Sequence, residues 1–285
     1  MLRFASLFIA LLAAAGIASA QGLDGRLKKI ADSKTISIAY RTDATPFSFL
    51  DDQKQPIGYT IDLCKRIASL IGEQVKVPGL QIKWVPVTTQ NRFDAVAKGQ
   101  ADMECGSSTV TLGRMKQVDF SNYTFVESTG LLTTTKTGIR SVADIAGKRV
   151  AVVSGTTNER AVNEFTKRRK LNLTVVPVKT REEGLAALED GKADAYASDK
   201  LLLIGAGVKS KDPKSLFLLP EDLSFEPYAI ALPRGDAGLR LAVNSALAHI
   251  YRDGEIGPIF GKWFGPLGEP GALLQAVFIF GSLSE

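Results

Sequence analysis

Residues 91–109 read NRFDAVAKGQADMECGSST, and residues 181–199 read REEGLAALEDGKADAYASD. Each stretch begins with a short helix-forming run, passes through a glycine, and continues into a short apolar run typical of a strand. In both stretches Gly-x-Ala-Asp opens the strand, and a polar residue follows that aspartate by five positions, Ser107 in the first and Asp199 in the second. One interpretation is that the two helix–glycine–strand units resemble each other by chance. The other is that the protein has two similar lobes facing each other across a cleft.

The same alternation of strand and helix extends outward from these two stretches. Strands are expected at 35–41, 81–87, 101–105, 125–135, 149–153, 174–178, 194–197 and 228–232, and helices at 62–71, 91–98, 142–145, 159–170, 182–189 and 237–251. Strands that alternate with helices are typical of an α/β protein with mostly parallel sheets. We therefore expect an α/β fold.

No long linker divides the chain, so the crossings between lobes must lie within strands. The best candidates are the extended run that ends at residue 135 and the strand 228–232. This predicts one lobe from residues 22–132 plus 229–285 and a second from residues 133–228, with a two-segment hinge that can close. The apolar tail, 273–280, is too short to span a membrane, and we expect it to dock against the first lobe.

The composition excludes several kinds of chemistry. The chain has 285 residues, 45% of them hydrophobic, with one histidine (His249) and two cysteines (Cys64 and Cys105). Three such residues are too few for a structural zinc site, which needs about four ligands. No phosphate-binding P-loop and no GxGxxG motif are present. The formal net charge is only +5, and the one dense basic run, 167–170, ends a predicted helix. We expect no metal, no cofactor and no nucleic-acid partner.

Residues 1–20 read MLRFASLFIALLAAAGIASA, which combines one arginine, an apolar run and an Ala-x-Ala cleavage pattern. This is typical of a cleaved signal peptide, so the mature protein is expected in the periplasm; a retained anchor is the alternative. In an oxidising compartment Cys64 and Cys105 either pair or stay buried as free thiols. A bridge would close a loop of about 40 residues and stabilise the fold by roughly 4 kcal/mol.

Polar side chains follow the expected strands at their carboxyl ends, where ligands bind in open α/β sheets. The candidate ligand-binding residues are Arg41, Thr89, Arg92, Ser107, Thr109, Arg114, Thr156, Thr157, Arg181 and Asp199. Arginine binds carboxylates with two parallel hydrogen bonds, hydroxyls at a helix start bind anions, and an aspartate accepts from an ammonium group. The set suits a small zwitterion with an additional acid group. Taken singly, each residue has a plainer interpretation as a surface ion pair or a helix cap.

The sequence resembles a known family, the glutamate/aspartate-binding proteins of ABC importers, which belong to the family 3 extracellular solute-binding proteins. The resemblance runs in family order over residues 35–265. The matching stretches are Arg41 with Pro46-Phe47-Ser48-Phe49, Gly58-Tyr59, Thr89-Gln90-Asn91-Arg92, Glu104-Cys105-Gly106-Ser107, Arg114, Val118-Asp119-Phe120-Ser121, Ser154-Gly155-Thr156-Thr157, Asp199 and Lys262-Trp263-Phe264.

The resemblance implies a two-lobed periplasmic-binding-protein fold of type II that closes on an amino acid between its lobes. By the family pattern Arg114 binds the α-carboxylate, helped by Ser107 and Thr156, and Asp199 binds the α-ammonium. Arg41 and Arg92, with Thr89, are implied contacts of the side-chain carboxylate. Arg181 falls where acidic-substrate relatives place another basic contact, often histidine. Both L-glutamate and L-aspartate remain candidates.

The function expected from this resemblance is capture of an acidic L-amino acid for an ABC permease at the inner membrane, by a monomer that is not an enzyme. Two alternatives stay open. One is a cyclohexadienyl dehydratase-like enzyme on the same fold, for which Glu104 and Glu127 are the nearby acids that could serve as a general acid. The other is a soluble sensor that presents its ligand-bound shape to a receptor.

Overall fold

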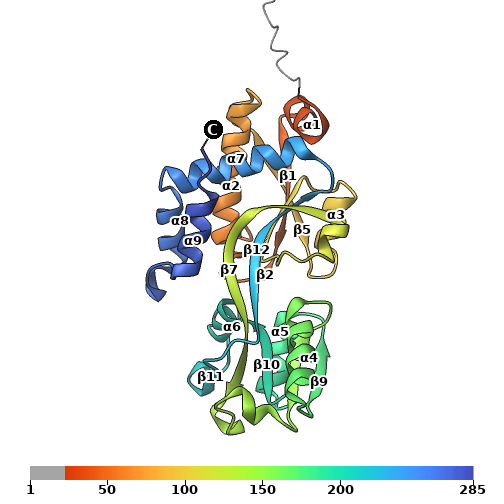
Figure 1. Cartoon of the computed structure of the whole chain (residues 1–285), viewed down its shortest axis with the longest axis vertical. Helices are drawn as coiled ribbons and strands as arrows, with labels where there is room; N and C mark the ends of the chain where they lie inside the picture. Colours follow the sequence, from red (N-terminus) through yellow and green to blue (C-terminus); the bar gives the residue numbers. More distant parts are fainter. Residues whose placement is uncertain (1–22, 285) are drawn as a thin grey trace, which may run out of the picture.

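A computed structural model describes residues 23–284, and the predicted signal peptide lies outside these residues. Figure 1 shows two lobes stacked along the long axis, which we call the upper and the lower lobe as they stand in that view. Two long strands, β7 (Val118–Thr134) and β12 (Ser224–Pro233), run from one lobe into the other. They are the two crossing segments, and both are longer than the sequence predicts.

Within residues 23–284, nine strands form one sheet that passes through both lobes. Along the sheet, the order is β5 (Gln81–Val87), β1 (Thr35–Arg41), β6 (Met103–Cys105), β12, β7, β10 (Ala195–Asp199), β8 (Arg149–Val153) and β9 (Thr174–Val178), and β11 (Leu216–Leu218) pairs with β7. The outer strands on each side are parallel to one another, whereas β12 and β7 are antiparallel. The expected α/β class is confirmed, but the sheet is mixed and not mostly parallel, because the two crossing strands pair antiparallel with each other and with β6 and β10.

The strand directions bring the carboxyl ends of the strands in the upper lobe close to those of the strands in the lower lobe. β7 runs from the upper to the lower lobe and β12 returns, antiparallel to it. Because β6 is antiparallel to β12, the carboxyl ends of β6, β1 and β5 point towards the lower lobe. Because β10 is antiparallel to β7, the carboxyl ends of β10, β8 and β9 point back towards the upper lobe. Polar residues after six strands therefore meet between the lobes.

Helices cover both faces of each half-sheet. The upper lobe contains α1 (Gly25–Ser33), α2 (Tyr59–Gln74), α3 (Arg92–Ala97), α7 (Ala237–Arg252), α8 (Ile256–Phe264) and α9 (Ala272–Gly281), and the lower lobe α4 (Thr157–Arg169), α5 (Arg181–Glu189) and α6 (Lys200–Gly207). A small sheet of β2 (Asp43–Ala44), β3 (Ser48–Leu50) and β4 (Pro56–Ile57) follows β1. The main upper core gathers residues from Leu27 to Leu274, whereas the lower cores use residues between Leu131 and Leu223.

The two sequence stretches quoted first adopt the same local structure. Gly99 and Gly191 both end a helix at positive φ, 74° and 66°, a conformation that favours glycine. The aspartate three positions later accepts a hydrogen bond from the first residues of the neighbouring parallel strand, Asp102 from Ser37 N–H (2.8 Å) and Asp194 from Arg149 N–H (2.8 Å). Each aspartate therefore fixes the start of its strand, and the polar residue of the site lies at the opposite, carboxyl end.

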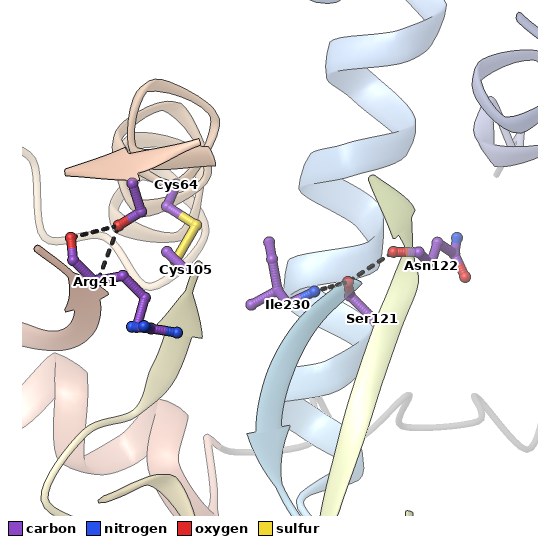
Figure 2. Close-up of a disulfide and its surroundings, with 7 residues drawn as sticks. Arg41, Cys64, Cys105, Ser121, Asn122 and Ile230 are labelled. Atoms are coloured by element: carbon purple, nitrogen blue, oxygen red, sulfur yellow. Dashed lines mark hydrogen bonds between the residues drawn. A yellow bond between two sulfur atoms is a disulfide. The ribbon is translucent and has the colours of Figure 1, made fainter. Parts of the chain in front are cut away.

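The crossing strands are held together across an irregular register. The pairing of β12 with β7 shifts on both sides of Ala229, and Figure 2 shows how the interruption is satisfied: the N–H of Ile230 donates to the hydroxyl of Ser121 (3.0 Å), which donates to the carbonyl of Asn122 (2.7 Å). A side-chain hydroxyl thus replaces one ladder hydrogen bond, and the hinge keeps its backbone groups paired.

Cys64 of α2 and Cys105 at the end of β6 form a disulfide beside Arg41 (Figure 2). The bridge ties the helix that covers the upper sheet to the strand that leads into Ser107. The sequence left this pairing open, and the structure joins the two cysteines.

The apolar tail forms α9 and packs against the upper lobe, as expected. Leu274 is buried in the upper core, and the ring of Phe278 lies 5.1 Å from that of Tyr251. No helix within residues 23–284 combines the length and the apolar composition needed to cross a membrane.

The predicted lobe boundaries, 22–132 with 229–285 and 133–228, both fall inside strands that continue from one core to the other. We retain them as a proposal for where the two lobes divide.

Candidate functional site

The predicted site residues meet where the two lobes touch. The Thr109 hydroxyl of the upper lobe lies 3.3 Å from that of Thr157 in the lower lobe. Arg181, at the start of α5 in the lower lobe, donates from Nη2 to the hydroxyl of Ser107 (3.4 Å). Gln90 also donates to the Lys179 carbonyl from the opposite side (3.2 Å). The lobes are thus in direct contact through residues that the sequence assigned to ligand binding.

Arg41 ends β1 and lies buried between a hydroxyl and a carboxylate. Its Nη2 donates to Thr89 Oγ1 (2.7 Å) and to Asp43 Oδ1 (2.6 Å). The backbone around it is fixed by Ser48, whose hydroxyl accepts from Arg41 N–H (2.9 Å). Burial and the charge of Arg181 lower the pKa of Arg41 to about 10. Arg41 and Thr89, predicted as neighbours, are in contact.

Arg92 opens α3 and is also buried, among groups of the upper lobe. Its Nε donates to Ser108 Oγ (2.9 Å), and its Nη1 donates to the Thr89 carbonyl. Arg92 and Arg114 lie over the same ring, Phe93, at 4.4 and 5.1 Å from its centroid. Burial and the neighbouring charge of Arg114 lower the pKa of Arg92 to about 9. A ligand carboxylate would relieve this concentration of positive charge.

Arg114 lies in a short 3₁₀ turn, Arg114–Lys116, and reaches back to the loop after β6. Its Nη1 donates to the Thr109 carbonyl (2.7 Å). The same threonine donates from its hydroxyl to Glu226 Oε2 (2.7 Å). Arg114 is therefore held between the Phe93 ring and the Ser107–Thr109 loop, with its charge facing the junction of the lobes.

Glu104 is fully buried in β6 beneath these arginines. A Cβ placed on Gly106 would overlap its Oε1, so the glycine gives this carboxyl group its room. Neither carboxyl oxygen has a hydrogen-bond partner among the described residues. Burial raises its pKa, against the lowering effect of the positive charge of Arg92. Glu104 underlies the arginines as a partial counter-charge.

Asp199 ends β10 and is the buried carboxylate of the lower lobe. Its Oδ1 accepts from Asn158 Nδ2 (2.9 Å), and that amide also donates to Thr129 Oγ1 (2.9 Å). Burial and the nearby carboxylate of Glu226 raise the pKa of Asp199 to about 6. A ligand ammonium beside Asp199 would offset both effects, because an opposite charge favours the ionised form.

Thr156 uses its side chain locally. Its hydroxyl donates to the Val153 carbonyl (2.7 Å) and accepts from Glu159 N–H (3.1 Å), which makes it the N-cap of α4. This is the plainer role that the sequence allowed for it. The next residue, Thr157, is the one that reaches Thr109 across the lobes.

Several residues in this network are not among the ten sequence candidates, among them Asp43, Ser108, Asn158 and Glu226. Ser108 and Asn158 lie within the polar stretches that follow β6 and β8, so their position was a usable signal. Asp43 comes two residues after Arg41, and Glu226 precedes the predicted strand 228–232. Their roles depend on contacts between the lobes that no local pattern encodes.

Three further features lie outside this hydrogen-bond network. Glu127, in β7, accepts from the N–H groups of Lys200 (3.1 Å) and Leu201 (3.3 Å) and so caps α6. His249, the one histidine, lies on α7 beside Asp253 (3.2 Å). An apolar cavity of about 510 Å³ between α6 and residues 265–274 contains none of the ten candidate residues.

The fold and the site together define a two-lobed α/β binding protein of type II, built to hold a small charged ligand between its lobes. Residues 36–266 match the family of bacterial extracellular solute-binding proteins, family 3, and the chain belongs to that family.

Relatives and solved structures agree with this family. The chain is 35% identical to an L-glutamate/L-aspartate-binding protein of Pseudomonas aeruginosa, over 86% of this chain and 82% of the relative. It is 33% identical to a glutamate/aspartate import solute-binding protein of Escherichia coli, over 91% and 87%. An ancestral arginine-binding protein bound to glutamine superposes with a TM-score of 0.72 at 27% identity, covering 81% of this chain and 98% of that one.

A further structural neighbour bears on the enzyme alternative. An ancestral amino acid-binding protein, a precursor of cyclohexadienyl dehydratase, matches with a TM-score of 0.72 at 27% identity, over 85% of this chain and 100% of the other. The relatives with the higher identities are named as binding proteins. This chain therefore groups with binding proteins and not with enzymes.

Proposed function

We propose that the protein captures an acidic L-amino acid, glutamate or aspartate, and delivers it to an ABC permease at the inner membrane. It would act in the periplasm as a monomer, after removal of residues 1–20. The names of the relatives support the ligand class. The observation that carries the proposal is the meeting of basic groups with one carboxylate at the junction of the lobes. Arg41 and Arg92 are buried in the upper lobe, and the charge of Arg181 from the lower lobe acts on both Arg41 and Asp199.

The contacts support a division of the site into two ends. At one end Arg114, with Ser107 and the start of α4 at Thr156 and Thr157, would bind the α-carboxylate, and Asp199 would bind the α-ammonium. At the other end Arg41, Arg92, Thr89 and Arg181 would bind the side-chain carboxylate. Charge-assisted hydrogen bonds contribute about 1.5–3 kcal/mol each, so several pairs suffice for the roughly 8 kcal/mol of a micromolar complex.

Closure follows from the same division. A ligand shifts the lobes towards the closed state only through contacts that the open state lacks. Thr157, Arg181 and Asp199 belong to the lower lobe, whereas Arg41, Arg92 and Arg114 belong to the upper one. A ligand that engages both sets would hold the lobes together, and the permease would recognise that closed form.

The test is calorimetric titration of ligand-stripped mature protein with L-glutamate, L-aspartate and L-glutamine. We expect micromolar or tighter binding of an acidic amino acid, recovered chemically unchanged. Asp199→Asn and Arg114→Gln should each abolish that binding, whereas Arg149→Gln, which breaks a surface pair with Asp194 at the far end of β10, should leave it intact. A folded protein that gives no heat with any of the three amino acids would contradict the proposed ligand.

Delivery and sensing can be separated in cells. Deletion of the protein should stop uptake of radiolabelled glutamate or aspartate at low external concentration, and expression of the wild-type chain should restore it. Unchanged uptake together with intact binding in vitro would favour the sensor alternative.

A further inference from the structure

One carboxylate bridges the basic groups of the two lobes. Asp43, in the short strand β2 of the upper lobe, accepts from Arg41 Nη2 through Oδ1 (2.6 Å). Its other oxygen, Oδ2, lies 3.2 Å from Nη1 of Arg181, which belongs to the lower lobe. Arg41 and Arg181 are two of the residues assigned above to the ligand's side-chain carboxylate. Asp43 is therefore an anion of the protein itself that lies beside the part of the site assigned to the ligand's side-chain carboxylate.

All three side chains of this bridge are largely shielded from water. The side chains of Arg41, Asp43 and Arg181 are 3%, 16% and 11% exposed. Burial alone would raise the pKa of the Asp43 carboxyl, but the positive charges of Arg181 and Arg41 outweigh it and hold the pKa below its usual value. Asp43 is thus an ionised counter-ion at neutral pH.

The bridge leaves one buried arginine donor for a second carboxylate. Arg41 Nε is buried and has no hydrogen-bond partner among the described residues, whereas Arg181 Nη1 faces Asp43. The remaining charged groups that act on Arg41 and Arg92 from the upper lobe are Glu104 and Arg114. A ligand carboxylate placed on Arg41 Nε would therefore lie in the field of Asp43 as well as that of the arginines.

We propose that Asp43 is a specificity-determining residue that offsets one positive charge at the side-chain end of the site and so limits how strongly the protein prefers an acidic over an amide side chain. This inference rests on the proposed function. Its physical basis is that a fixed negative charge a few ångströms from the ligand carboxylate repels it, while it acts much less on the neutral amide of the same shape.

Asp43→Asn removes the negative charge and keeps the size of the side chain. Affinities for L-glutamate and L-glutamine, and for L-aspartate and L-asparagine, are measured by calorimetry at pH 7. We expect the preference for the acid over its amide to increase on the order of tenfold in the variant. An unchanged or smaller preference would overturn the inference.

The matched control is Asp194→Asn. Asp194 also pairs with an arginine, Arg149 (2.8 Å), and the substitution changes the net charge by the same amount, but Asp194 lies at the other end of β10 from Asp199. Its acid-to-amide preference should equal that of the wild type. Thermal unfolding of both variants shows whether either substitution perturbs the fold itself.

A double-mutant cycle tests the bridge. If Asp43 acts on selectivity through the positive charge of Arg181, then Asp43→Asn should change the preference less in an Arg181→Gln background than in the wild type. Full additivity would contradict an action through the bridge. Wild-type protein that binds neither acidic amino acid would overturn the proposed function, whereas acid binding with an unchanged preference in Asp43→Asn would overturn this inference alone.

Discussion

At the scale of single residues, the proposed role of Asp199 as the ammonium partner implies a pH range in which the site works. Its pKa is raised to about 6 by burial and by the charge of Glu226. Below that pH the free protein carries a neutral carboxyl group, which attracts an ammonium group far less than a carboxylate does. The affinity for an amino acid should therefore fall about tenfold between pH 7 and pH 5.

Calorimetric titrations of the wild type across this range would measure the fall. An affinity that stays constant from pH 7 to pH 5 would argue that Asp199 is not the ammonium partner.

Glu127 gives a second residue-scale prediction, for stability. Burial and the charge of Asp199 raise its pKa from 4.5 to about 8. A carboxyl group whose folded pKa is raised stabilises the fold fully below its unfolded pKa, and this contribution is lost as the pH rises through about 8. The free energy of unfolding should fall between pH 6 and pH 9 by at least about 1.4 kcal/mol more in the wild type than in Glu127→Gln.

Urea unfolding at the two pH values provides the measurement. Parallel losses of stability in the wild type and the variant would show that Glu127 does not titrate in this range.

Much of the residue-level site could be predicted because position after a strand is a local signal. Arg41, Ser107 and Asp199 each close or follow a strand whose apolar pattern is legible in the sequence, and all lie at the junction of the lobes. Asp43 could not be predicted in this way, because its proposed role depends on its contact with Arg181, which is remote in sequence and belongs to the other lobe. The capping role of Thr156 was foreseen only as the plainer alternative.

At the scale of secondary-structure elements, the disulfide links α2 to the end of β6, next to the loop that carries Ser107. The cysteines are 41 residues apart, so the bridge should stabilise the fold by about 4 kcal/mol on the chain-entropy model. The double variant Cys64→Ser/Cys105→Ser should unfold at correspondingly lower urea concentration.

The control for this prediction is a reducing agent. It should destabilise the wild type and leave the double variant unchanged. Equal stability of wild type and variant without reductant would contradict a stabilising role for the bridge.

Element lengths were harder to predict than element types. The sequence predicts strands at 125–135 and 228–232, whereas β7 and β12 extend over Val118–Thr134 and Ser224–Pro233. Their additional residues alternate less clearly because each strand passes from one lobe's core, through the junction, into the other. The neighbours change along the strand, so its periodicity changes too.

At the scale of the whole molecule, close packing of the lobes at Gly205 controls closure. A Cβ on this residue of α6 would overlap the carbonyl oxygen of Thr45 in the upper lobe. Gly205→Ala should therefore hold the lobes apart, and because such overlap costs about 1–3 kcal/mol, ligand affinity should fall about tenfold or more.

Gly207→Ala is the matched control, since a Cβ there would meet only Leu216 Cδ1, at 3.4 Å, within the lower lobe. Small-angle scattering with saturating ligand would report the degree of closure. A compact, tightly binding Gly205→Ala protein would show that the lobes close without this contact.

The two crossing strands also determine the order in which the chain can become compact during synthesis and export. The lower cores draw their residues from between Leu131 and Leu223. The main upper core joins Leu27 near the start of the described chain to Leu274 near its end. The lower lobe can thus condense before α7 has been made, whereas the upper core, with Arg41 and its neighbours, must wait for the C-terminal helices. Late completion of the upper lobe therefore leaves the first residues of the upper core without their packing partners until the end of synthesis.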